Sequence, residues 1–281
     1  MPRVTVAMPC YNSELHLAAT LANLLDQTAT DFNVIIYDNA STDGTNAIAQ
    51  KFAARDKRVS IVRRPVTVDL YENFRLSLAE TDCDYFMWRA DDDLTVPNYL
   101  EVLIRALDEN PAAILAGSHI FTHKVGPNIT ISRPFPQRLA DPVADRLNMI
   151  RNGHTSWIYG LCRRAAFQPA YDAVLGLLSQ NWGSDYLLLF QLIMRGQIVG
   201  SNATQFTQRT MADTRKAGKI HVPSAEQWAI FSAFRKTCYA EIDASPFGAA
   251  DKARLKAAAL KYSLRHTFRF RKMLITRLKG R

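Results

Sequence analysis

Apolar and polar positions follow two alternating periods over the first 120 residues of the chain. Short apolar runs, typical of strands buried on both faces, are followed by stretches in which apolar residues recur at helical spacing. The predicted strands are 4–8, 32–37, 59–62, 85–88 and 112–117. The predicted helices between them are 14–25, 43–54, 70–79 and 97–107. This alternation predicts an α/β fold with a mostly parallel sheet covered by helices on both faces.

The rest of the chain is less regular. Residues 120–138 are polar and lie among several prolines, so we expect a loop-rich segment there. We predict helices at 141–151, 184–195, 225–240 and 252–278, and strands at 157–162 and within 198–209. Ser184 is expected to cap the helix 184–195, and one of Ser41, Thr42 and Asp43 is expected to cap the helix 43–54.

Polar residues follow three of the predicted strands at the point where each strand ends. They are residues 9–12 after the first strand, 38–43 after the second and 91–93 after the fourth. Parallel sheets bind ligands at the carboxyl ends of their strands. We therefore expect the three clusters to converge on one crevice.

The cluster after the fourth strand consists of Asp91, Asp92 and Asp93. Adjacent carboxylates repel one another unless a cation or hydrogen bonds neutralise them. Mg²⁺ and Mn²⁺ prefer oxygen ligands and are commonly held by one or two carboxylates together with substrate phosphates. The triplet therefore predicts a divalent metal site, and a solvated acidic loop or a cap for the following helix is the alternative.

The chain carries 35 Lys and Arg against 26 Asp and Glu, and the excess lies at its end. Residues 252–281 hold 11 Lys and Arg and no acid, which leaves 24 basic against 26 acidic residues in 1–251. A nucleic-acid-binding domain more often carries positive charge over its folded face, so we expect no nucleic-acid partner. Apolar residues between the basic ones predict a helix that lies on an anionic membrane surface; a helix packed on the protein is the alternative.

Other features narrow the class of protein. Cys10, Cys83, Cys162 and Cys238 lie far apart, which predicts buried thiols rather than a zinc or redox site. No apolar run reaches the roughly 18–20 residues of a membrane-spanning helix, and the first residues lack the layout of a signal peptide. We therefore expect a cytoplasmic location, including the inner face of the plasma membrane. No P-loop, dinucleotide-binding glycine motif or hydrolase elbow is present in the sequence.

Several motifs together resemble glycosyltransferase family 2. They are Val6-Ala7-Met8-Pro9-Cys10-Tyr11-Asn12, Gln27-Thr28, Asp31-Phe32, Asp38-Asn39-Ala40-Ser41-Thr42-Asp43-Gly44-Thr45 and Asp91-Asp92-Asp93. The resemblance is dense over residues 3–117, weaker to about residue 210 and absent from the tail. It implies the GT-A fold, a nucleotide-sugar donor, Mg²⁺ or Mn²⁺, and inversion at the anomeric carbon.

The resemblance also implies a donor site. Pro9 and Tyr11 would form a wall against the base of the nucleotide, and Asp38 or Asn39 would read the edge of the base. Asn39 stands where many members carry an acid, which leaves UDP-, dTDP- and GDP-linked donors open.

Further donor contacts follow from the same resemblance. Asn12 and Asn73 are candidate contacts to the nucleotide sugar. Asp91 resembles a ribose or diphosphate contact, Asp92 the principal metal ligand, and Asp93 a second metal ligand.

The remaining candidates lie in the second half of the chain. Asp185 matches the Asp of the family's Glu-Asp motif, with Ser184 in place of the Glu, and is the candidate general base. Its alternative role is to cap the helix that it begins. His154 and Arg209 are candidate contacts to the acceptor or the diphosphate, with a structural histidine and a solvated basic loop as the alternatives.

We therefore expect a metal-dependent inverting glycosyltransferase of surface polysaccharide or glycolipid assembly, with a saccharide or lipid-linked acceptor. Residues 1–220 would form the catalytic domain, 1–120 binding the donor and 121–220 shaping the acceptor side, followed by C-terminal helices at 221–281. Two other functions stay open. A sugar-phosphate nucleotidyltransferase should carry a glycine-rich basic loop after the first strand, and a non-enzymatic protein would bind nucleic acid through the basic tail.

Overall fold

The computed structural model describes residues 3–125, 128–177, 183–211 and 224–267. It divides into two compact units, which we call the sheet unit and the helical unit. The sheet unit comprises residues 1–135, 156–168 and 198–213, and the helical unit comprises 136–155, 169–197 and 214–281. This division differs from the boundaries expected at residues 120 and 220, because later segments of the chain return to complete the sheet.

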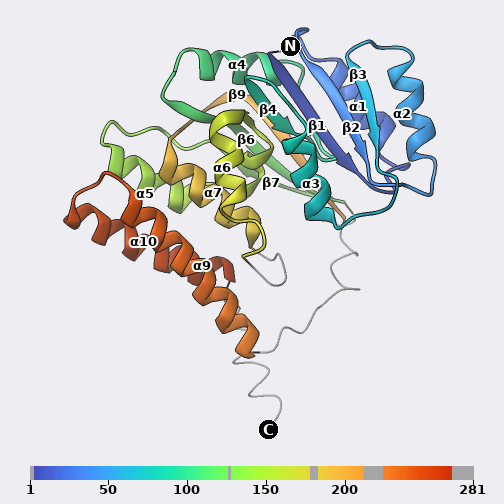
Figure 1. Ribbon diagram of the computed structural model, residues 1–281. Coiled ribbons are helices and arrows are strands. Elements are labelled where there is room, and N and C mark those ends of the chain that lie inside the picture. The colour runs from blue at the N-terminus through green and yellow to red at the C-terminus, as the bar shows by residue number, and fades with distance from the viewer. Residues whose placement is uncertain (1–2, 126–127, 178–182, 212–223, 268–281) are drawn as a thin grey trace. The chain divides into compact units, whose positions relative to one another are not determined.

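The sheet unit is built on four parallel strands that pair in the order β3-β2-β1-β4 (Figure 1). These strands are β1 (Val4–Cys10), β2 (Asn33–Asp38), β3 (Val59–Arg63) and β4 (Tyr85–Trp88). The sheet continues through β8 (Leu161–Arg163), β6 (Ala113–Val125), β9 (Gln197–Met211) and β5 (Leu94–Thr95). Within the described residues, every antiparallel pair involves one of these later strands or β7 (Ile129–Arg133), and the first of them joins β4 to β8. The predicted mostly parallel α/β sheet is confirmed.

Helices cover both faces of this sheet. They are α1 (Leu17–Leu25), α2 (Thr45–Ala53), α3 (Leu70–Ala79), α4 (Tyr99–Asp108) and the beginning of α6 (Arg164–Asp172). The ring of Trp88 packs edge-on against Phe74 of α3 and Phe167 of α6, with ring centroids 5.2 and 5.0 Å apart. The next residue, Arg89, points to the other face and donates to Asn23 of α1. Alternate side chains of one strand thus contact helices on opposite faces.

The segment 120–138, expected to be loop-rich, is largely a hairpin. Strand β6 continues to Val125 and pairs with β7 from Ile120–Arg133 to Lys124–Ile129. Strand β7 is mostly exposed, so its side chains need no apolar pattern. Main-chain hydrogen bonds to β6 stabilise this strand, and the pattern of polar and apolar side chains in β7 does not predict those bonds.

The strand predicted at 157–162 is also corrected. Residues Thr155–Tyr159 form a 3-10 helix, and the strand β8 begins only at Leu161. The buried indole of Trp157 donates to the carbonyl of Ser118 at 3.0 Å. A Cβ on Gly160 would lie 2.3 Å from the carbonyl oxygen of Ala116, so only glycine fits this close approach between backbones.

Two predicted helix caps differ in detail from the structure. Helix α2 has Gly44 as its N-cap residue, although the carboxylate of Asp43 still accepts from the amide of Thr45 at 3.0 Å. In helix α7 (Ser184–Arg195), Ser184 is the first helical residue, and the N-cap position belongs to Gly183 with a positive φ of 91°. Glycine adopts this conformation without the steric cost that a side chain would bring.

The helical unit contains α5 (Pro142–Asn152), α7, α9 (Ser224–Ala244) and α10 (Ala249–Thr267). Helix α5 begins as predicted, since the carboxylate of Asp141 accepts from the amide of Ala144 and Pro142 follows it. Helices α9 and α10 lie side by side in the orange and red part of the chain (Figure 1).

Helix α10 changes the interpretation of the basic tail. Its apolar residues Leu255, Ala259 and Tyr262 are buried, so they are not available to a membrane surface. For residues 252–267 the structure therefore favours the packed helix, which the sequence left as the alternative. Residues 268–281 lie outside the described part of the chain. None of the described helices combines the length and apolar character that a bilayer span requires.

Candidate active site

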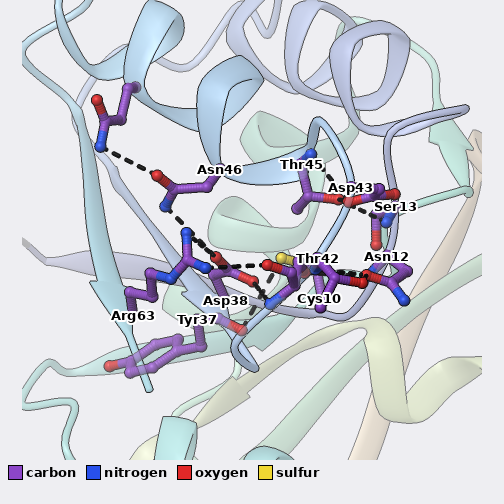
Figure 2. Close-up of polar contacts among 12 residues, drawn as sticks. Cys10, Asn12, Ser13, Tyr37, Asp38, Thr42, Asp43, Thr45, Asn46 and Arg63 are labelled. Atoms are coloured by element: carbon purple, nitrogen blue, oxygen red, sulfur yellow. Dashed lines mark hydrogen bonds and ion pairs between the residues drawn. The ribbon is translucent and has the colours of Figure 1, made fainter. Parts of the chain in front are cut away.

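Hydrogen bonds join the loops that follow β1 and β2 at the carboxyl edge of the sheet (Figure 2). The amide of Asn12 donates to the hydroxyl of Ser41 at 3.0 Å, and the amide of Thr42 donates back to the side chain of Asn12 at 2.9 Å. Asn12 itself has a positive φ of 51°, which asparagine tolerates better than most residues. The predicted donor contact Asn12 therefore joins the two loops.

Asp38 ends β2 and is fully buried within this edge. One carboxylate oxygen accepts from the amide of Ser41 at 2.9 Å, and the other accepts from the amide group of Asn46 at 3.4 Å (Figure 2). The guanidinium of Arg63 lies 3.6 Å from the second oxygen. Both oxygens of Asp38 thus have partners within the protein.

Two buried asparagines fix the chain segment around β2 and α3. The side chain of Asn39 donates to the carbonyl of Val68 at 2.8 Å and accepts from the amide of Val68 at 2.9 Å. The side chain of Asn73 donates to the carbonyl of Tyr37 at 3.0 Å and accepts from Arg64 at 3.3 Å. The carbonyl and the amide group of both asparagine side chains therefore already have hydrogen-bond partners within the protein, whether or not either residue also contacts a nucleotide.

Pro9 and Tyr11 lie at the end of β1. Pro9 is buried and pairs with Tyr37 of β2, while Tyr11 is 47% exposed. The main-chain carbonyl of Ala7 points toward β4 and accepts from the amide of Arg89. Backbone groups two residues apart point to the same side of a strand, so those of Pro9 point the same way, beyond the end of β4. A proline fits there because no ladder hydrogen bond is lost.

The three aspartates after β4 occupy different environments. Asp91 and Asp92 are half-buried, whereas Asp93 is buried and accepts from the amide of Arg209 at 2.9 Å. Burial, and then the charge of Asp92, raises the pKa of Asp93 to about 7, although Arg89 and Arg209 oppose this shift. Burial and the charge of Asp91 likewise raise the pKa of Asp92. Asp91 and Asp92 are therefore the more accessible pair of carboxylates.

The polar clusters of β1, β2 and β4 do converge. Burial raises the pKa of the Cys10 thiol at the end of β1, and the charges of Asp38, Asp91 and Asp43 raise it further. Asp38 ends β2, Asp43 follows that strand and Asp91 follows β4. Because β1 pairs in parallel with both β2 and β4, the three strand ends lie at the same edge. The hydroxyl of Thr20 in α1 also donates to the carbonyl of Asp91 at 2.8 Å.

Two basic residues of this edge were not assigned a role from the sequence. Arg89 is fully buried, donates to the carbonyl of Asp93 at 2.9 Å, and has its pKa lowered to about 10 by burial. His16, at the N-cap position of α1, lies close enough to Asp92 to lower the pKa of that carboxyl. The sequence offered a signal for Arg89, because a charged residue directly follows an apolar strand. Nothing in the local sequence pattern distinguished His16.

Arg209 lies on β9, beside the aspartates. Its Nε donates to the carbonyl of Asp92, and its amide binds Asp93. Among the described residues, its Nη2 atom is buried without a hydrogen-bond partner. This nitrogen is a free donor beside a predicted diphosphate site. The basic segment 212–219 that follows lies outside the described residues.

Asp185 and His154 belong to the helical unit. Asp185 lies in the first turn of α7 and is exposed, yet the protein around it raises the pKa of its carboxyl by desolvation. Solvent on the exposed side limits the size of this shift. In the described part of the chain, no hydrogen bond to its carboxylate contributes to the shift. His154 is half-buried between α5 and the 3-10 helix.

The sequence pattern of Glycosyl transferase family 2 matches residues 5–169, more than half of the chain. The chain belongs to glycosyl transferase family 2. The matched region contains β1 to β8 and every candidate residue of the strand edge except Arg209. It ends before Asp185, so membership by itself assigns no role to that residue.

Curated relatives match only part of this chain. EpsE of Bacillus subtilis (strain 168) is 32% identical over 110 residues, 39% of this chain and 40% of EpsE. The Escherichia coli protein WfgD, named as a UDP-Glc:alpha-D-GlcNAc-diphosphoundecaprenol beta-1,3-glucosyltransferase, is 22% identical over 116 residues, 41% of this chain and 45% of WfgD. The chain thus matches less than half the length of either relative.

Solved structures extend the likeness of this family 2 chain to its fold. S. aureus TarS 1-349 in complex with UDP-GlcNAc has a TM-score of 0.69 at 17% identity, covering 94% of this chain and 73% of that one. The mannosyltransferase PcManGT from Pyrobaculum calidifontis in complex with GDP-Man and Mn2+ has a TM-score of 0.56 at 15% identity, covering 94% and 74%. At these identities the likeness concerns the fold alone, and it confirms the predicted GT-A fold.

The paired hydrogen bonds between Asn39 and Val68 lead to a test of what Asn39 does. In Asn39→Asp, a carboxylate replaces the donor and faces the carbonyl of Val68, so we expect the free energy of unfolding to fall by about 1–3 kcal/mol. Chemical denaturation measures this change. Asn110→Asp is the exposed control, because it also replaces a donor to a main-chain carbonyl, that of Ala106 at 2.9 Å. Water solvates the new carboxylate there, so stability should change by at most about 1 kcal/mol. An Asn39→Asp variant as stable as the wild type, with a changed preference among UDP, dTDP and GDP, would instead make Asn39 a reader of the base.

Proposed function

We propose that this chain transfers a sugar from a nucleotide-diphosphate sugar to a hydroxyl acceptor, with inversion at the anomeric carbon. The observation that carries the proposal is the convergence of three strand ends on one carboxylate-lined edge, in a chain of glycosyl transferase family 2. A nucleotidyltransferase is not favoured, because the segment at the end of β1 is Pro9-Cys10-Tyr11-Asn12 rather than a glycine-rich basic loop. Nucleic-acid binding is not favoured either, since the body of the chain is nearly neutral.

The donor is proposed to bind along the carboxyl edge of β1, β2 and β4. Tyr11, exposed beyond the end of β1, would pack against the base with Pro9 beneath it. Asn39 and Asn73 are proposed as further donor contacts, and the structure supports a role in fixing the main chain around the base. UDP-, dTDP- and GDP-linked donors remain the candidates, since UDP-GlcNAc and GDP-Man each occupy a chain of similar fold.

Mg²⁺ or Mn²⁺ is proposed as the cofactor, and the residues present fit such an ion. Asp91 and Asp92 are partly accessible. Burial and then the charge of Asp91 raise the pKa of Asp92, and a cation would relieve the repulsion between the two carboxylates. Among the described residues, no group of three or more His, Cys, Asp or Glu is arranged to hold a metal by itself. One or two carboxylates with donor phosphates are the usual ligands of Mg²⁺.

The division of labour among the three aspartates follows from their burial. Asp92 would be the principal metal ligand, and Asp91 would contact the ribose or diphosphate. Asp93 was predicted as a second ligand; its oxygen Oδ1 already accepts from the amide of Arg209, which supports a role in holding β9 beside the site. When bound, the ion would offset negative charge on the departing diphosphate. The Nη2 atom of Arg209, which has no hydrogen-bond partner in the described part of the chain, would donate to the same group.

The proposed reaction is a single displacement. Asp185 accepts the proton of the acceptor hydroxyl while the hydroxyl oxygen forms a bond to the anomeric carbon. The bond from that carbon to the phosphate oxygen breaks, and the nucleoside diphosphate leaves with the bonding electrons. A raised pKa makes Asp185 a stronger base than an ordinary aspartate. His154 is proposed as a contact to the acceptor or the diphosphate.

The metal role is tested with Asp92→Asn. We expect Mn²⁺ to raise the affinity of the wild type for one class of nucleotide sugar at least tenfold, and the variant to lose this increment because a charged ligand is removed. Isothermal titration with UDP-, dTDP- and GDP-sugars, with Mn²⁺ or EDTA, measures it. Asp82→Asn, an exposed acid at the opposite end of β4, is the matched control. Full donor affinity and turnover in EDTA would contradict the metal role.

The base role is tested with Asp185→Asn. We expect turnover to fall about 10²–10⁴-fold, the usual range for a general base, while donor affinity stays constant. In the wild type, turnover should also fall as the pH drops through the raised pKa of Asp185, because the protonated carboxyl cannot accept the proton. The variant should lack this acidic limb. Asp251→Asn, an acid in the first turn of α10, is the control; equal turnover of Asp185→Asn and the control would show that Asp185 is not the base.

The acceptor is proposed to be a saccharide or a lipid-linked saccharide of surface polysaccharide or glycolipid assembly. The name of WfgD, whose acceptor is a sugar on a lipid diphosphate, supports this class. Docking on an anionic membrane would bring the enzyme close to such an acceptor. Six of the basic residues of the tail lie in 268–281, and Lys261 and Arg265 are exposed on α10. Each basic residue near such a surface contributes about 1 kcal/mol.

Membrane docking is tested by comparing the full chain with a chain that ends at Thr267, since α10 is then kept. We expect the full chain to co-sediment with phosphatidylglycerol vesicles at low salt and to be released as salt is raised, because the attraction is electrostatic. The shortened chain should bind much less. Neutral phosphatidylcholine vesicles are the control. Equal sedimentation of the two chains, or binding that does not depend on salt, would reject docking through residues 268–281.

A further inference from the structure

The beginning of α7 is held by two aromatic residues of α10. The ring of His266 stacks on the ring of Tyr186, with centroids 3.7 Å apart and planes at 22°. The hydroxyl of Tyr262 donates to the main-chain carbonyl of Tyr186 at 3.0 Å. Tyr186 directly follows Asp185, so both contacts act on the residue next to the candidate base. All four residues belong to the helical unit.

Tyr262 is itself held firmly. It is buried, and its ring packs against Phe190 of α7 and Phe234 of α9, with centroids 5.7 and 6.0 Å apart. Its ring also meets that of His266 at 4.4 Å. Burial lowers the pKa of His266 to about 4, so near neutral pH an uncharged ring stacks on Tyr186. The contacts from α10 thus come from a packed aromatic cluster rather than from a free surface.

Among the described residues, no side-chain cap supports the first turn of α7. Gly183, at the N-cap position, has no side chain that could accept from the free amides of this turn. Helix ends without such a cap tend to fray. A general base must be held in a narrow range of positions, because a small misplacement lowers the rate strongly. Whatever fixes Tyr186 therefore also decides where the carboxylate of Asp185 lies.

We propose that Tyr262 and His266 are positioning residues that hold the first turn of α7 and thereby orient Asp185. The proposal rests on the proposed role of Asp185 as the base. Helix α10, which carries none of the family motifs, then contributes to catalysis. The hydroxyl of Tyr262 fixes the main chain after Asp185, and the neutral ring of His266 fixes the side chain of Tyr186.

The experiment uses the full chain and measures the release of nucleoside diphosphate from the nucleotide sugar that binds best, with water as the acceptor if no other is found. The variants are Tyr262→Phe, His266→Ala and His266→Phe, each made also in the Asp185→Asn background. Tyr239→Phe is the control, because it removes a hydroxyl from the same helical unit, where its ring contacts Arg235 and Lys256 instead. Donor affinity and the melting temperature are measured for every variant.

We expect Tyr262→Phe and His266→Ala each to lower kcat about five- to tenfold, the scale of one lost hydrogen bond or ring contact, with donor affinity unchanged. His266→Phe keeps the stacked ring and should recover most of the rate lost in His266→Ala. In the Asp185→Asn background the same changes should have no further effect on kcat, because a positioning residue acts only through the base. Tyr239→Phe should leave kcat unchanged.

Two other results would overturn the proposal. If Tyr262→Phe lowers the melting temperature but not kcat, or lowers kcat equally with and without Asp185, the contacts are structural only. The base role then still stands, provided that Asp185→Asn itself is slow. If Asp185→Asn turns over donor at the wild-type rate, or no nucleotide sugar binds to the wild type, the proposed function fails first and the positioning role fails with it.

Discussion

Negative charge gathered at one edge of a parallel sheet is the constraint on which this structure depends. Asp38, Asp43 and Asp91 all act on the buried thiol of Cys10. In addition to burial, the charge of Asp91 raises the pKa of Asp92, and the charge of Asp92 raises the pKa of Asp93. Buried carboxylates that repel one another destabilise a fold unless positive charge or hydrogen bonds offset the repulsion. The acids of this edge therefore differ in which partner, if any, offsets their negative charge.

Those partners separate structural acids from acids that remain for a ligand. Asp38 has the amide of Ser41, Asn46 and Arg63, and Asp93 has the amide of Arg209 with Arg89 beneath. Asp91 and Asp92 keep the accessible positions. This difference is the physical basis for assigning the proposed metal to Asp92. The charges of Asp93 and Asp92 offset that of the fully buried Arg89.

The helical unit contains a different kind of site, that of the candidate base Asp185. Asp185 carries no offsetting charge in the described part of the chain, and the surrounding protein raises its pKa instead. That environment suits a residue that must accept a proton. The aromatic cluster of Tyr262 and His266 fixes the neighbouring Tyr186 without adding a charge that would weaken the base. Helix α10 thus combines buried apolar contacts with a position beside the candidate base.

The sequence by itself determined the strand and helix order of residues 4–108 except for the two-residue strand β5, because buried strands and amphipathic helices leave distinct periods in the chain. It also determined that the polar residues after β1, β2 and β4 meet, since parallel strands end at one edge. Tertiary structure alone decided the β6–β7 hairpin, whose exposed side chains carry no periodic signal, and the turn at Gly160, where two backbones approach closely. It also decided that Asn39 binds Val68, that Arg89 is buried beside Asp93, and that α10 packs against the beginning of α7. Such contacts join residues far apart in the chain, and no local pattern of polarity records which distant group a side chain will meet.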